Sequence, residues 1–189
     1  MKTDLSSYNN NWYKPGSKLK ILLWYFINVI FFQNSLNPSS GLKVVLLKLF
    51  GARIGEGVVI KPGVNIKYPW KLEIGNHSWI GEKVWIDNLA EVKIDSNVCL
   101  SQGAMLLCGN HNYKKPAFDL IVKDIVLEDG VWIGTKSVVC PGVVCRSHSI
   151  LAVSSVANKD LNAYKVYQGN PAVAVRERIK EEIATSGKA

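Results

Sequence analysis

The sequence of 189 residues lacks the features of a membrane-spanning or secreted protein. Its most apolar stretch, residues 21–32, is shorter than the roughly 20 residues that a helix needs to cross a bilayer, and Asn28 interrupts it. We recognise no signal-peptide pattern in the sequence. We therefore expect a cytoplasmic protein with reduced cysteines.

Signals for metal or nucleic-acid binding are also missing. The four cysteines, Cys99, Cys108, Cys140 and Cys145, form no CxxC pair, and no second ligand stands at metal spacing from His111. The 23 basic residues exceed the 15 acidic ones, giving a net charge of +8, but they are scattered and follow no nucleic-acid motif. This charge suits an anionic small molecule, and we expect neither a metal nor a nucleic acid.

What the sequence does contain is a period of six residues from about Ile54 onward. The second position of the hexads is often Gly or Asp, and the fifth is small or β-branched. The opening positions are aliphatic or Cys: Ile54, Ile60, Ile66, Ile74, Ile80, Ile86, Ile94, Leu100, Leu106, Leu127, Ile133, Val139, Cys145 and Leu151.

This period predicts a mainly β fold, a left-handed parallel β-helix in which three hexads make one triangular coil. Each short strand points one aliphatic side chain inward, and Gly near a corner accepts unusual backbone angles. An antiparallel sandwich is the alternative, but it would show a period of two with variable loops. The register slips after Ile66 and after Ile86, which we interpret as corner bulges, and the gap between Leu106 and Leu127 predicts an ejected loop.

The chain divides into three parts: a helical cap over 1–50, the β-helix over 51–168 with its loop at about 107–124, and a carboxy-terminal helix and tail over 169–189. The cap should hold two helices, at 18–32 and 41–50, with Ser17 and Ser40 as N-caps. Four side chains of the second helix lie on one face and should pack on the first coil: Leu42, Val45, Leu46 and Leu49. Pro171 is placed to begin a short last helix.

The stretch from residue 21 to 32 leaves alternatives open. Its aromatic side chains, among them Trp24, Tyr25, Phe26 and Phe31, suit a cover over the first coil. They equally suit peripheral contact with a membrane or docking onto an assembly partner. We favour the cover.

The ejected loop carries the residue best suited to chemistry. A β-helix has no cleft of its own, so a polar loop beside His111 is where a pocket can form, especially against a neighbouring subunit. Imidazole is the usual base when an alcohol attacks a thioester. His77 and His148 fall at corner positions of regular hexads, and we interpret both as surface residues.

Several segments together resemble the hexapeptide-repeat acetyltransferases, specifically the sugar O-acetyltransferases related to maltose and galactoside acetyltransferases, and most closely the colanic acid biosynthesis branch. The similarity extends from about Gly41 to Arg176. It rests on these segments: IDNL from Ile86, LSQGA from Leu100, LCGNH from Leu107, GVWIG from Gly130, VCPGV from Val139 and GNPA from Gly169.

The resemblance implies an acetyl-coenzyme A-dependent homotrimer that acetylates a sugar hydroxyl in surface polysaccharide biosynthesis, with His111 as general base. It places these residues at the acceptor: Asp87, Asn88, Asn112, Tyr113 and Phe118. It places these at the donor: Trp132, Gly134, Thr135, Val153, Ser154, Asn158, Lys159 and Arg176. Asn112 and Val173 differ from the residues common in the family.

Alternative interpretations of these residues and of the function remain open. Asp87 and Asn88 are also typical corner residues, and Lys159 and Arg176 are also typical solvated surface charges. The acceptor is alternatively an antibiotic, serine or an amino sugar. A non-catalytic scaffold is the second class of function, since fold alone does not fix activity.

Overall fold

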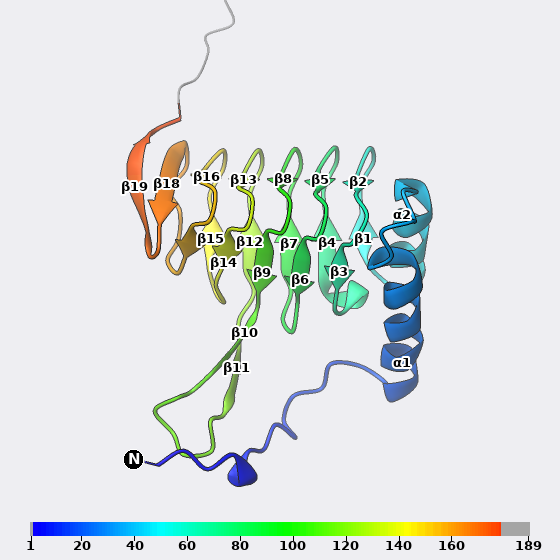
Figure 1. The fold of residues 1–189 in the computed structure, drawn as a ribbon, viewed down its shortest axis with the longest axis vertical. Coiled ribbons are helices and arrows are strands. Elements are labelled where there is room, and N and C mark those ends of the chain that lie inside the picture. Colours follow the sequence, from blue (N-terminus) through cyan, green and yellow to red (C-terminus); the bar gives the residue numbers. More distant parts are fainter. Residues whose placement is uncertain (1, 179–189) are drawn as a thin grey trace, which may run out of the picture.

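The computed structural model describes residues 2–178, and residues 53–169 wind into a parallel β-helix with three faces (Figure 1). Face 1 contains β1 (Arg53–Ile54), β4 (Leu72–Ile74), β7 (Val92–Ile94), β12 (Ile125–Leu127) and β15 (Val144–Cys145). Face 2 contains β2 (Val59–Ile60), β5 (Trp79–Ile80), β8 (Cys99–Leu100), β13 (Trp132–Ile133), β16 (Ile150–Leu151), β18 (Lys165–Gly169) and β19 (Ala172–Glu177). Face 3 contains β3 (Asn65–Ile66), β6 (Trp85–Asp87), β9 (Met105–Leu107), β14 (Val138–Val139) and β17 (Val156–Ala157). The predicted left-handed parallel β-helix is confirmed.

The hexad-opening residues form the core. Ile60, Ile80 and Leu100 follow one another in register on face 2, and all are 0% exposed. Burying each such side chain contributes about 1.5 to 3 kcal/mol relative to leaving it in water. The small residues at the fifth position, such as Ser78 and Ser137, are buried beneath them. A single aliphatic column therefore runs the length of the solenoid.

The glycines at the second hexad position have a different role from the one expected. Gly81 and Gly134 have ordinary backbone angles, but a Cβ on either would lie 2.6 or 2.7 Å from a carbonyl oxygen of the next coil. The left-handed corners are instead two residues further on, at positions such as Gly57 and Lys136, with φ of +65° and +56°. Close approach of successive coils, not turn geometry, requires glycine at the second position.

The register slips correspond to local features of the chain. The first accommodates a 3₁₀ turn, η3 (Pro69–Lys71). The large gap is a hairpin, not an irregular loop: β10 (Gly109–His111) pairs antiparallel with β11 (Leu120–Val122). It leaves the solenoid between β9 of face 3 and β12 of face 1 and projects away from the coils (Figure 1).

Two helices close the amino-terminal end of the solenoid: α1 (Lys18–Ile27), continued by one π-helical turn, η2 (Asn28–Phe32), and α2 (Ser40–Leu49). Ser17 caps α1 as predicted, accepting a hydrogen bond from the Lys20 amide. Ser39, not Ser40, caps α2. The Ser40 hydroxyl is used differently, because it bonds to the backbone of Ile60 in the first coil. No helix within residues 2–178 is long and apolar enough to span a membrane.

The prediction for the packed face of α2 was right for Leu46, which packs against the core, and wrong for the other three residues. Leu42, Val45 and Leu49 are exposed, and the side chains fully buried against the first coil are Lys43 and Leu47. The physical reason is the open end of the solenoid, where no further coil supplies hydrogen-bond donors. Lys43 Nζ donates to the carbonyl of Asn37 at 2.8 Å and reaches two carbonyls of the first coil at 3.4 Å.

The predicted carboxy-terminal helix was also wrong over the residues described. Residues 172–177 form strand β19, which pairs antiparallel with β18. Without β19, β18 would end face 2 with an unpaired edge, and an edge is a template for unwanted pairing. The remainder of the predicted helix, 179–189, lies outside the described residues.

Candidate active site

His111 stands at the end of β10, where its ring is held from two sides. Its Nδ1 lies 2.8 Å from the carbonyl oxygen of Phe118, and its ring stacks on the Phe118 ring with centroids 4.5 Å apart. Because a carbonyl only accepts, Nδ1 carries the proton in this hydrogen bond, and Nε2 is left as the basic nitrogen. The fixed tautomer is the one that a general base needs.

The hairpin brings Phe118 back to His111. Phe118 has a left-handed backbone (φ +52°), and the Asn112 amide donates to the Asp119 carbonyl across the turn. At the base, Gly109 allows the hairpin to pass Leu89, because a Cβ there would lie 2.5 Å from that side chain. In this chain a backbone carbonyl therefore orients the imidazole.

The amino-terminal segment, residues 2–17, forms a wall of the His111 site that the sequence analysis missed. It begins with a short 3₁₀ turn, η1 (Leu5–Ser7), beside the hairpin, where the Asp4 amide donates to the Pro116 carbonyl. The Tyr8 ring lies 5.8 Å from the His111 ring. The only available signal was its composition, YNNNWYKPG, which is aromatic and polar without helix or strand periodicity.

Two cavities meet at His111. One, of about 340 Å³, is lined by Leu5, Tyr8, His111 and Phe118. The other, of about 430 Å³, adds polar groups from the solenoid; its lining includes Tyr8, Asn10, Tyr13, Lys67, Tyr68 and His111. Aromatic faces beside polar groups and a base are a suitable environment for a sugar-sized ligand.

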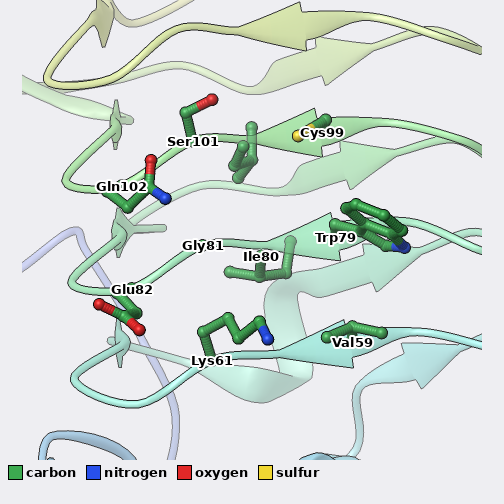
Figure 2. Close-up of a pocket in the computed structure, with 10 residues that line it drawn as sticks. Val59, Lys61, Trp79, Ile80, Gly81, Glu82, Cys99, Ser101 and Gln102 are labelled. Atoms are coloured by element: carbon green, nitrogen blue, oxygen red, sulfur yellow. The ribbon is translucent and has the colours of Figure 1, made fainter.

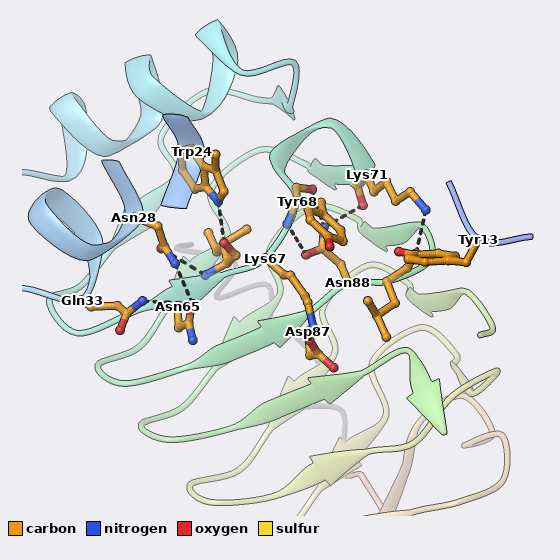
Figure 3. A network of polar contacts seen from close by, with 12 residues as sticks. Tyr13, Trp24, Asn28, Gln33, Asn65, Lys67, Tyr68, Lys71, Asp87 and Asn88 are labelled. Carbon is orange, nitrogen blue, oxygen red and sulfur yellow. Dashed lines mark hydrogen bonds and ion pairs between the residues drawn. The ribbon is translucent and has the colours of Figure 1, made fainter. Parts of the chain in front are cut away.

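The larger cavity is lined by two phenols, Tyr13, which is partly buried, and Tyr68, which is buried. Burial raises the pKa of each, so both are neutral near pH 7. The Tyr13 hydroxyl donates to the Leu89 carbonyl at 2.6 Å, which ties the amino-terminal segment to the solenoid (Figure 3).

The five residues expected at the acceptor do not all gather there. Phe118 touches His111, whereas Asn112 and Tyr113 lie at the hairpin tip, outside both cavities. Asp87 forms an ion pair with Lys67 at 2.9 Å and lines an adjoining cavity of about 270 Å³ on face 3. Lys67 lines that cavity and the larger His111 cavity, so it connects them.

Asn88 has a structural role that corrects its expected place at the acceptor. It is 0% exposed, and its amide accepts from the Tyr68 amide and donates to the carbonyls of Tyr68 and Lys71 (Figure 3). No polar atom is left for a ligand. Asn88 also lacks the left-handed backbone of a corner residue; it holds the bulge that follows β3.

Most of the residues expected at the donor lie on face 2 or at its corner with face 3. A cavity of about 260 Å³ near the carboxy-terminal end is lined in part by Trp132, Gly134, Thr135, Val153 and Arg176. Ser154, at the corner between faces 2 and 3, is exposed and does not line it, and neither do exposed Asn158 and Lys159, which follow β17 of face 3. Five of the eight residues that the resemblance assigns to the donor therefore line one cavity.

A second cavity on face 2, of about 450 Å³, was not predicted (Figure 2). It is lined by residues including Lys61, Trp79, Cys99, Ser101 and Gln102. Trp132 Nε1 donates to Ser101 Oγ at 2.8 Å, and Thr135 bonds to Gln102, so side chains that line the two cavities contact each other. The missed signal was Trp79, Cys99 and Trp132 at outward strand positions, where solvent would favour polar residues.

The surroundings of Cys108, His77 and His148 differ from those of His111. Burial raises the pKa of Cys108 to about 12, so a thiolate nucleophile is disfavoured there. His77 is exposed, but half-buried His148 stacks on Tyr164 with centroids 4.9 Å apart. Within residues 2–178 no three metal-ligating side chains come together.

His111 and the donor residues occupy different sides of one chain. The hairpin leaves between faces 3 and 1, whereas the Trp132 cavity lies on face 2. None of the cavities described for residues 2–178 is lined by both sets.

Comparison with known proteins shows that this chain is similar in sequence to acetyltransferases. No family model matches the chain. The colanic acid biosynthesis acetyltransferase WcaF of Escherichia coli is 35% identical over 180 residues, covering 95% of this chain and 99% of that protein. The galactoside O-acetyltransferase of Escherichia coli is 27% identical over 135 residues, covering 70% of this chain and 66% of that one.

Solved structures agree on the fold. A hexapeptide-repeat acetyltransferase from Vibrio cholerae, solved with acetyl-coenzyme A, aligns with a TM-score of 0.77 at 22% identity, covering 86% of this chain and 89% of that one. A galactoside acetyltransferase in complex with coenzyme A aligns with a TM-score of 0.75 at 23% identity, covering 85% and 82%.

Proposed function

Because the chain belongs to the hexapeptide-repeat acetyltransferase family, we propose that it transfers the acetyl group of acetyl-coenzyme A to a sugar hydroxyl, with His111 as general base. The observation that carries the proposal is the Nδ1 hydrogen bond to Phe118, which leaves Nε2 basic in a side chain that lines two cavities. The names of the relatives, WcaF and galactoside O-acetyltransferase, support a sugar acceptor in polysaccharide biosynthesis.

In this mechanism Nε2 of His111 takes the hydroxyl proton as the oxygen attacks the thioester carbonyl. The tetrahedral intermediate then collapses, the carbon–sulfur bond breaks, and the imidazolium returns the proton to the coenzyme A thiolate. Phe118 contributes in two ways. Its carbonyl stabilises the imidazolium, and its ring fixes the plane of the imidazole.

We assign the acceptor to the cavities beside His111. Tyr8 and Phe118 offer aromatic faces on which an apolar sugar face packs, and Lys67, paired with Asp87, offers polar groups. Asp87 stays in the proposal at the edge of this site. We propose instead that Asn112 and Tyr113, at the hairpin tip, contact a neighbouring subunit.

We assign the donor to the Trp132 cavity. Its lining offers backbone and apolar surface for the pantetheine arm, and Arg176 on β19 is a cation for the phosphates. Ser154, Asn158 and Lys159 lie along the same end of the solenoid and remain proposed contacts of the adenine and phosphates.

A homotrimer would bring the two halves together. Acyl transfer requires the thioester carbon and the hydroxyl oxygen in contact, and one chain holds the two halves on different sides. Face 1 carries a charged ladder, with Arg53 bonded to Glu73 at 2.7 Å. Faces 2 and 3 instead point apolar residues outward, such as Trp79, Trp85 and Met105, which suits contact with two neighbours. We place the reaction in the cytoplasm, which fits the four free cysteines.

The test is thiol release from acetyl-coenzyme A against free, nucleotide-linked and lipid-linked sugars. We expect His111→Ala to lower kcat about 100-fold or more with donor binding intact. The matched control is His77→Asn, because His77 is exposed and its left-handed backbone tolerates Asn. A wild-type protein that binds no acetyl-coenzyme A would refute the proposal, and so would a His111→Ala enzyme that keeps full activity.

A further inference from the structure

The outward side of the two amino-terminal helices is almost entirely apolar. We call it the end patch, and its members range from 41% to 74% exposed: Leu19, Leu22, Leu23, Phe26, Ile30, Leu42, Val45 and Leu49. The first five follow helical spacing along α1 and η2, and the last three follow it along α2. A continuous apolar face of this kind on a soluble domain marks an interaction surface.

Buried anchors fix this orientation of the helices. Trp24 Nε1 donates to the Ile66 carbonyl at 2.7 Å, and Asn28 donates to the Asn65 side chain at 2.7 Å (Figure 3). On α2, buried Lys43 donates to backbone carbonyls. Rotating either helix to bury its leucines would break these bonds, so the outward apolar face is built into the fold.

The end patch lies at the end of the molecule. Figure 1 places both α1 and α2 beyond β1, at the opposite end of the solenoid from β18 and β19. The hairpin and the amino-terminal segment run along another side, and neither covers the patch. In a trimer with parallel solenoids, three copies of the patch would point the same way.

The charges around the patch indicate what covers it. Between Leu5 and Gly55 the sequence has no Asp or Glu, whereas it has Lys14, Lys18, Lys20, Lys43, Lys48 and Arg53. Of these, Lys43 is buried and Arg53 is paired with Glu73, so the exposed unpaired charge comes from the other lysines. Two such ends packed against each other would bring like charges together. An anionic lipid surface, in contrast, satisfies the leucines and the lysines at once.

We propose that the end patch docks the protein onto the surface of an anionic bilayer. The ten residues of α1 span only about 15 Å, so the helix lies in the interface and does not cross it. The leucines and Phe26 enter the acyl boundary, and Lys18 and Lys48 contact the headgroups. This docking does not depend on the proposed acyl transfer. The docking experiment measures vesicle binding alone, so its result is independent of enzyme activity.

The experiment is flotation of the full chain with vesicles of phosphatidylcholine alone or of equal parts phosphatidylcholine and phosphatidylglycerol. We expect binding to the anionic vesicles, weakened by high salt. The variant Leu22→Gln/Phe26→Gln/Leu49→Gln should lower the bound fraction about tenfold. Its matched control is Val175→Gln, an exposed apolar residue at the far end of the solenoid.

Charge-reversal variants distinguish docking onto anionic lipid from non-specific hydrophobic adsorption. Lys18→Glu/Lys48→Glu should weaken anionic binding about tenfold, whereas Lys83→Glu/Lys123→Glu, which reverses two exposed lysines on the solenoid, should change it little. Circular dichroism checks folding. The proposal is overturned if the wild-type protein does not bind anionic vesicles, or if the glutamine variant binds them as well as wild type does. A wild type that ignores vesicles but forms larger oligomers, which the glutamine variant abolishes, would assign the patch to a second copy.

Discussion

Replacing Asn88 by Ala should destabilise the protein without harming catalysis by the folded enzyme. The substitution leaves the buried Tyr68 amide without its acceptor. It also removes one donor from the Lys71 carbonyl and one from the Tyr68 carbonyl, which keeps a bond from the Lys71 amide. One fully orphaned group and two weakened ones cost about 2 to 4 kcal/mol.

The assay is urea unfolding at one fixed protein concentration, followed by acceptor KM on the folded fraction. With a slope of about 2 kcal/mol per molar urea, the midpoint should fall by about 1 to 2 M. Asn97→Gly is the control, because Asn97 is exposed and has a left-handed backbone that glycine accepts at no steric cost. An unchanged midpoint together with a raised acceptor KM would refute the structural role of Asn88.

Three further predictions concern the same elements. Tyr13→Phe removes the bond to Leu89, worth about 1 kcal/mol, and should raise acceptor KM about fivefold while donor KM stays unchanged; equal changes in both would contradict the assigned wall. Gly134→Ala places a Cβ 2.7 Å from the Leu151 carbonyl and should lower the melting temperature, whereas Gly41→Ala, with open space, should not. Burial lowers the pKa of Lys43 below 10.5, so between the two pKa values the unfolded chain binds a proton that the folded chain lacks. The free energy of unfolding of wild type relative to Lys43→Met should therefore rise as the pH increases from the lowered pKa toward 10.5. A difference that falls over this range would contradict the lowered pKa.

The solenoid could be predicted because its sequence signal is repeated in every coil. Each hexad carries the same inward aliphatic, so a misread residue changes little, and the buried positions from Ile54 to Leu151 follow the expected register. His111 was singled out for the opposite reason, since it stands where the repeat breaks, and its role as base stays a prediction. A local pattern also located the Ser17 cap, whereas the residues around Trp132 were grouped by the family resemblance.

The failures arose where a partner distant in sequence decides the outcome. The packed face of α2 was predicted from hydrophobicity. In the structure Lys43 points inward instead, because carbonyls of the first coil accept hydrogen bonds from its Nζ. Residues 172–177 look helical alone, but the edge of β18 makes them a strand. Asn88 and the Tyr8 wall likewise depend on contacts with Tyr68 and with the hairpin that no local pattern encodes.

Subunit mixing tests the central claim, that His111 of one copy acts on a donor held by another. His111→Ala subunits and Trp132→Ala/Arg176→Ala subunits, each inactive alone, are unfolded together, refolded and assayed for thiol release. Random trimers should recover roughly a quarter of wild-type activity, because one interface in four combines an intact His111 with an intact donor cavity. Mixed trimers that form but recover no activity would contradict a site shared between copies.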